Sequence, residues 1–129
     1  MAFTDAKLIS IVAGTTFAST QKFKGVVVNA SGHAVLPDTT AAQGRVIGTL
    51  YSETGSTSAA GTEVVNVAYG PIVKVNMAAS TLAAGGSMSF STAGVGVAMS
   101  TDDLQPWGII LDGSSGAAGR IVTVVRTAG

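Results

Sequence analysis

The sequence has no cysteine and little charge. Without Cys among its 129 residues, a disulfide scaffold, a thiolate metal site and a cysteine nucleophile are all excluded. Charged residues make up 11% of the chain, against roughly a quarter in an average soluble domain. The 7 Lys and Arg are scattered and balanced by 7 Asp and Glu, so the chain lacks the basic face that a nucleic-acid binder needs.

Long apolar runs and aromatic residues are also scarce. The longest apolar runs, Val26–Val28 and Ile109–Leu111, are far shorter than the ~20 residues that span a bilayer as a helix. The first residues lack a basic leader and carry Asp5, so we expect neither a membrane segment nor a signal peptide. Aromatic residues are only 5%, and a core of Ala and Val gains less from burial, at about 25 cal/mol per Å², than one of Phe and Leu. Self-association would compensate for such a lean core.

The residues that are abundant favour strands. The chain has 16 Val and 7 Ile against 6 Leu, and β-branched side chains suit a pleated strand better than a helix. Short strand-like segments bounded by Gly, Ser, Asn or Asp recur about every ten residues, which is typical of a sandwich or barrel. We therefore expect an all-β fold, a compact small β-barrel or sandwich of about nine short strands. The expected strands are Phe23–Asn29, Ala34–Leu36, Arg45–Tyr51, Glu63–Tyr69, Ile72–Asn76, Ser87–Ser91, Val95–Met99, Trp107–Leu111 and Arg120–Arg126.

The chain divides into an N-terminal segment, residues 1–20, and a single β domain, residues 21–129. The apolar stretch Leu8–Val12 is either an ordinary first strand or an extended arm that adds its backbone to the sheet edge of a partner. The best helical segment is Met77–Ala84, which is rich in Ala but too short for more than a turn or two.

Turn and loop signals repeat along the chain in the same order, about 60 residues apart. Either Ala- and Gly-rich strands match one another by chance, or the chain holds two similar β units closed on a shared core. In the second case the paired glycines that lie within strands mark a bulge or a close approach of backbones. The matched glycines are Gly32 and Gly94 (62 apart), Gly48 and Gly108 (60 apart), and Gly61 and Gly119 (58 apart).

Residues for catalysis or metal binding are few. His33 is the one His and follows a turn, and no Gly-x-Ser-x-Gly elbow presents a nucleophile. Asp102 and Asp103 are neighbours in a polar turn, so they serve their own backbone rather than a shared site. A metal site needs three or four convergent ligands, and with one His, no Cys and no calcium-binding loop the sequence supports neither a zinc nor a calcium site. We expect no catalytic residue, no metal, no cofactor and no enzymatic activity.

Two further sequence features each have two interpretations. Asn29-Ala30-Ser31 matches the glycosylation sequon, but a hairpin turn accounts for it better. Trp107, the sole Trp, is either a binding platform or an anchor in the core or at the rim of the second β unit. We group Trp107 with Tyr51 and Tyr69 as residues expected to take part in self-association or to lie at a rim.

Patterns along nearly the whole chain resemble those of one known family, the small capsid decoration (cement) proteins of tailed bacteriophages. These are patterns of Gly, Ala and Val rather than a chemical motif. They are LISIVA at residues 8–13, KGVVVNASG at 24–32, GRVIGTL at 44–50, AGTEVVNV at 60–67, LAAGGSM at 82–88, PWGIIL at 106–111 and AGRIVTV at 118–124.

This resemblance implies a β-barrel-like head-stabilising protein, made in the host cytoplasm and bound to the outer capsid surface of the virion. It implies a homotrimer at threefold and quasi-threefold positions that holds neighbouring copies of the major capsid protein together. By the same resemblance, the capsid contact falls on the N-terminal segment. The residues expected to make it are Phe3, Leu8, Ile9, Ile11 and Val12.

The alternative is a carbohydrate- or cell-binding β domain of a phage fibre or spike. In that case Trp107, Tyr51 and Tyr69 would form the binding face.

Overall fold

The fold is nearly all β. The computed structural model describes residues 5–39, 45–52, 61–78, 80–82, 84–99, 106–112, 114–116 and 119–127. These ranges hold eleven strands and one short 3-10 helix, η1 (Ser19–Gln21), so the expected all-β class is confirmed, with two strands more than expected. The strands are β1 (Asp5–Val12), β2 (Gly25–Val28), β3 (Ala34–Val35), β4 (Gly48–Leu50), β5 (Val64–Met77), β6 (Ser80–Leu82), β7 (Ser87–Phe90), β8 (Gly96–Ala98), β9 (Gly108–Ile110), β10 (Ser114–Gly116) and β11 (Arg120–Arg126).

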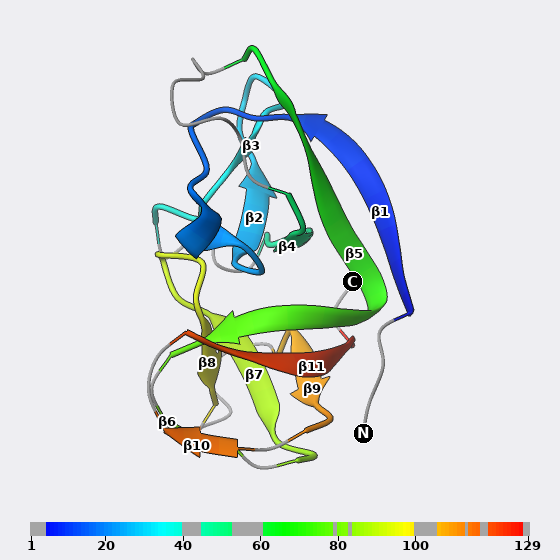
Figure 1. The fold of residues 1–129 in the computed structure, drawn as a ribbon, viewed down its shortest axis with the longest axis vertical. Helices are drawn as coiled ribbons and strands as arrows, with labels where there is room; N and C mark the ends of the chain where they lie inside the picture. The colour runs from blue at the N-terminus through cyan, green and yellow to red at the C-terminus, as the bar shows by residue number, and fades with distance from the viewer. Residues whose placement is uncertain are drawn as a thin grey trace.

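The longest strand, β5, belongs to both halves of the molecule (Figure 1). Two separate strands were expected here, but β5 continues through Gly70-Pro71 and turns sharply between its two halves. Opposite it, β1 places Leu8 against Ala68 and Lys7 against Gly70, so Tyr69 is an extra residue, a bulge that bends the strand. Gly70 has a φ of +129°, a conformation that favours glycine.

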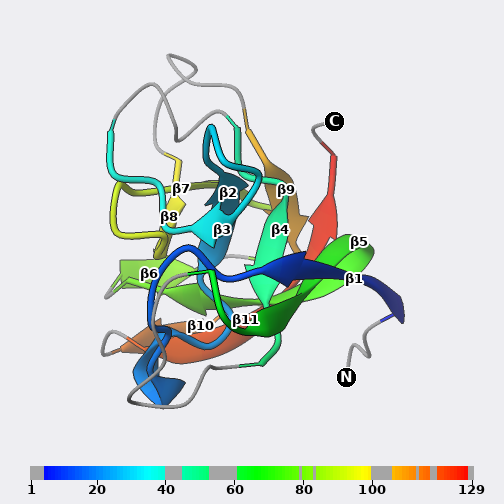
Figure 2. The same ribbon diagram turned by 90° about the horizontal axis from the view of Figure 1, so that it is seen from above.

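A first closed unit is built from β1, the N-terminal half of β5, β4, β2 and β3. Each of these strands pairs antiparallel with the next in that order. A parallel bridge between Ala13, just after β1, and Ala34 of β3 closes the ring. In this unit β1 lies along the outer side of the molecule in Figure 1, and it runs beside β5 in both views (Figures 1 and 2).

A second closed unit is built from the C-terminal half of β5, β11, β9, β7 and β8. These strands also pair antiparallel in that order. A parallel pairing of Met77 in β5 with Gly96 in β8 closes a five-stranded barrel. Both units are thus closed rings, and in the described residues the edge of β1 that faces away from β5 is paired only at Ala13.

The two units repeat one another, strand for strand, which confirms the interpretation of two similar β units. The hydrogen bonds that follow each closing bridge also match: Gly14 N donates to Ala34 O at 2.8 Å, and Ala78 N donates to Gly96 O at 2.8 Å. Three residue pairs of the first unit have a counterpart in the second. Val26–Gly48 corresponds to Met88–Gly108, Val27–Val35 to Ser89–Val97, and Leu50–Val67 to Ile110–Val124.

The core is divided into two clusters rather than formed as one shared core. The bend in β5 separates them, because it directs the inner faces of its two halves to different rings (Figure 1). One cluster lies inside the first unit and comprises Ala13, Phe17, Val26, Ala34, Leu50, Val65 and Val67. The other fills the second unit and reaches across the junction; it comprises Val27, Val46, Ala68, Val73, Val75, Met77, Met88, Phe90, Trp107, Ile110, Val122 and Val124.

Gly48 and Gly108 occupy equivalent positions at the starts of β4 and β9. A Cβ at Gly48 would clash with the carbonyl oxygen of Ala68, and one at Gly108 would lie 2.6 Å from that of Val125. Both contacts are with backbone, which cannot move aside as a side chain can. The close approach of backbones expected from sequence is therefore present at both positions.

The predicted helical turn over Met77–Ala84 is wrong. Met77 ends β5, and Ser80–Leu82 is β6, which pairs antiparallel with β10 in a separate two-stranded sheet. The Ala-rich composition misled the prediction, since pairing with a partner strand overrides a weak local helical preference. The partner, β10, lies in a stretch rich in Ser and Gly.

Candidate functional site

The described residues contain no cluster suited to hold a metal ion and no helix long and apolar enough to cross a membrane. Asp102 and Asp103 lie outside the described residues. The turn before His33 is organised by Asn29, whose Oδ1 accepts hydrogen bonds from Ser31 N at 2.9 Å and from His33 N at 3.0 Å. The asparagine of the sequon thus serves the hairpin turn.

The most accessible apolar surface in the predicted capsid contact lies on β1. Leu8 is 49% exposed and Ile9 is 38% exposed, whereas Ile11 and Val12 are half-buried. Phe3 lies outside the described residues. Because Ile11 packs against the core of the first unit, β1 is an integral strand here, with its exposed end toward Leu8.

The outer edge of β1 has backbone groups directed away from the protein. Asn66, opposite Ser10, uses its own N–H and C=O on the other side of β5: its N donates to Ser52 Oγ at 2.9 Å, and its O accepts from Tyr51 N at 2.8 Å. Ser10 therefore directs its N–H and C=O away from β5, whereas the parallel bridge of Ala13 with Ala34 occupies the same side next to Val12. Within the described part of the chain, the only pairing on this edge is the bridge after the strand, at Ala13.

Trp107 lies inside the second unit. It is 5% exposed, its Nε1 donates to Val46 O at 3.0 Å, and its ring meets Phe90 edge to face at 5.0 Å. Such a ring presents little surface to a sugar or a partner. Tyr69 and Tyr51 are half-buried, so the structure does not bring the three expected aromatic residues to one exposed face.

Tyr51 packs edge to face against Phe23, with ring centroids 5.2 Å apart. Its hydroxyl oxygen is buried and has no hydrogen-bond partner among the described residues.

Arg126 joins the two units. Its Nη1 donates to Ile47 O at 2.6 Å and to Tyr69 O at 2.7 Å, and the guanidinium lies 5.2 Å from the centre of the Trp107 ring. Partial burial lowers the pKa of Arg126 because desolvation disfavours the cation. Sequence reasoning missed this residue, since its position at the end of β11 carries no motif.

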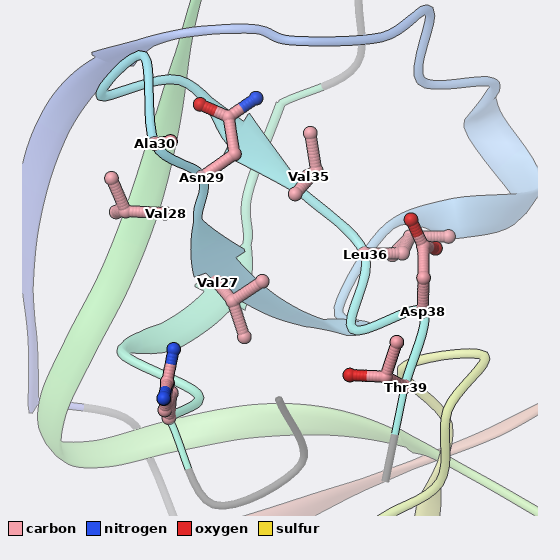
Figure 3. A pocket seen from close by; sticks show the side chains of 9 residues that line it. Val27, Val28, Asn29, Ala30, Val35, Leu36, Asp38 and Thr39 are labelled. Carbon is pink, nitrogen blue, oxygen red and sulfur yellow. The ribbon is translucent and has the colours of Figure 1, made fainter. Parts of the chain in front are cut away.

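A hollow of about 260 Å³ opens beside the β2–β3 hairpin (Figure 3). Valine and leucine side chains form much of its wall, with Asp38 and Arg45 as its charged groups. Opposite charges on an apolar wall suit no single ligand chemistry, so this hollow does not define a site. The lining residues are Val27, Val28, Asn29, Ala30, Val35, Leu36, Asp38, Thr39 and Arg45.

The geometry defines a small all-β protein of two similar closed units with an open, partly apolar strand edge. No known family model matches the sequence, and no curated protein matches it. Among solved structures, the chain is similar to the crystal structure of the head fiber gp8.5 N base in bacteriophage phi29. The likeness has a TM-score of 0.53 at 14% identity and covers 96% of each chain, so it establishes a common fold over the full length.

Proposed function

We propose that this chain is a structural protein of a bacteriophage head that binds the outer surface of the capsid and catalyses no reaction. The observation that carries the proposal is the fold shared with a phage head fiber base over 96% of both chains. The sequence resemblance to capsid decoration proteins supports the same location. In this proposal the protein is a homotrimer at threefold and quasi-threefold positions and stabilises the lattice of the major capsid protein.

The open edge of β1 is the proposed capsid contact. Backbone groups at Ser10 point outward, and Leu8 and Ile9 add exposed apolar surface beside them. An extended segment of a partner can add to such an edge, with main-chain hydrogen bonds supplying affinity and apolar side chains supplying specificity. Three such contacts in a trimer raise the overall affinity through effective concentration, even where one contact is weak.

The experiment is co-sedimentation with expanded capsids that lack a decoration protein, followed by heating of the decorated capsids. We expect saturable binding and capsids that resist heat better. Ser10→Pro removes the outward N–H of an edge position, where proline is tolerated, and is expected to abolish binding while the fold is retained. Ser10→Ala is the matched control, since it loses only the side-chain hydrogen bond to Asn66 Oδ1. Absence of binding by the unmodified protein would overturn the proposal.

The trimer is tested separately by size-exclusion chromatography with light scattering. Exposed apolar side chains occur on both units and supply surface for subunit contacts. A monomer at every concentration would contradict the trimer but leave attachment to the capsid open to the sedimentation test. The exposed apolar residues are Leu8, Ile9, Val28, Val64, Leu111 and Ile121.

A further inference from the structure

A second hollow, of about 420 Å³, lies where the two units meet. Its volume falls within the range of roughly 300–1,000 Å³ typical of small-molecule sites, which often form between domains. Residues of the η1 segment and the turn after it form one side, and residues of β5 and β11 form the other. The lining residues are Ser19, Thr20, Lys22, Phe23, Asn76, Gly119 and Ile121.

Phe23 adopts a backbone conformation that the repeat assigns to glycine. Its φ is +67°, and the equivalent residue of the second unit is Gly85, with a φ of +85°. The two positions make the same backbone contact: Phe23 N donates to Leu50 O at 2.7 Å, and Gly85 N donates to Ile110 O at 2.7 Å. A bulky residue in the left-handed region is strained, and such strain persists where the side chain has a use.

The ring of Phe23 forms part of the hollow at the junction. It is held edge to face by Tyr51, and its backbone oxygen accepts a hydrogen bond from Asn76 N of the second unit at 2.9 Å. Lys22 places its Nζ 5.6 Å from the centre of the same ring. In the described residues the contact of this exposed ammonium is with an aromatic face, which binds it weakly, so it can turn toward an anion.

The chemistry of the lining selects one class of small molecule. Ser19 and Thr20 carry hydroxyls and Asn76 carries an amide, which suit the hydroxyls of a polyol. Phe23 and Ile121 supply apolar surface for the C–H groups of a pyranose ring, and Ile121 is 42% exposed. The described lining holds one ammonium and no carboxylate, so it favours a ligand with negative charge.

We infer that this hollow binds a sugar acid, a pyranose whose carboxylate pairs with Lys22 and whose apolar face lies against Phe23. The site is distinct from the β1 edge, so the inference stands or falls independently of capsid binding. The hollow is also distinct from the carbohydrate-binding face that the sequence allows for Trp107, Tyr51 and Tyr69.

The test is titration of the ¹⁵N-labelled protein with sodium glucuronate, with glucose and sodium acetate as separate probes. We expect saturable shifts of the backbone amides at Lys22, Phe23 and Asn76 with glucuronate, weaker shifts with glucose, and no saturation with acetate. Equal responses to glucuronate and acetate would reduce the site to a general anion contact and overturn the inference. Equal responses to glucuronate and glucose would overturn the part given to Lys22, and absence of saturable shifts would overturn the whole.

Two variants and one control sharpen the result. Lys22→Gln is expected to weaken glucuronate binding about tenfold and leave glucose unchanged, since only the charged ligand loses a charge-assisted hydrogen bond. Phe23→Gly matches the backbone preference of the equivalent Gly85 and is expected to keep a dispersed spectrum while losing saturation by both sugars. Lys7→Gln, on β1 opposite Gly70, removes the same charge from an exposed residue that does not line the hollow and is expected to change nothing. Unchanged binding in Lys22→Gln and Phe23→Gly together would refute the assignment.

Discussion

Replacing Arg126 by methionine tests whether contacts between the two units stabilise the whole fold. The change removes two hydrogen bonds from a cation, to Ile47 O and Tyr69 O, and the contact of the guanidinium with Trp107. Methionine keeps the apolar stem of the side chain, so the loss reports mainly on the guanidinium.

The magnitude follows from these three contacts. A hydrogen bond to a charged group contributes about 1.5–3 kcal/mol, and the lower end applies because Arg126 is only half-buried. The cation–π contact adds about 0.5–1 kcal/mol at a partly exposed site. The expected loss is therefore about 3.5–4 kcal/mol, a large share of the roughly 5–15 kcal/mol that stabilises a typical domain.

Urea unfolding, followed by Trp107 fluorescence and by circular dichroism, measures this loss. Coincident transitions from the two probes would show that both units unfold together, as the bridging contacts require. Arg126→Lys keeps the charge but not the planar donor group and is expected to fall between the two proteins. A loss below about 1 kcal/mol for Arg126→Met would refute the reasoning, because water would then replace the guanidinium at both carbonyls.

Three further predictions concern packing and hydrogen bonding. Gly48→Ala and Gly108→Ala are each expected to lower the free energy of unfolding, measured in urea, by at least about 2 kcal/mol, because each new methyl meets a backbone carbonyl. Gly32→Ala adds a methyl that meets no atom within 4 Å, so it measures the strain of a positive φ without a steric clash. Tyr51→Phe is expected to leave the melting temperature unchanged or raise it, since it removes a buried hydroxyl without a described partner. Clear destabilisation would mean that this hydroxyl is satisfied.

The repeat could be predicted from sequence because its turns require glycine. Gly32 and Gly94 have φ values of +79° and +80°, a region that other residues avoid, so both copies of the turn retain the same residue. The equivalence of β1 with the second half of β5 could not be predicted. Ala13 and Met77 hold matching positions at the closing bridges, yet buried apolar positions tolerate different residues provided the space is filled.

The candidate sites were predictable only in part. The apolar pattern of Leu8–Val12 indicates a contact segment, but its division into a buried end and an exposed end depends on the bend of β5. Phe23 could not be found from sequence, because a left-handed φ is expected at glycine and the neighbouring residues give no sign of it. Its hollow also combines residues more than 50 positions apart, which the fold brings together only after both units close.

The repeat also explains why the outer edge of β1 suits a partner strand. In the second unit the equivalent strand has β11 on one edge, and the first unit covers the other: Asp5 pairs with Ile72, and Thr49 Oγ1 donates to Lys74 O at 2.9 Å. No strand in the described residues does the same for β1. A segment paired antiparallel with β1 would therefore extend an arrangement that the protein already forms once within itself. A partner that contacts β1 through side chains alone would bind the Ser10→Pro variant normally, so this substitution separates strand addition from simple apolar contact.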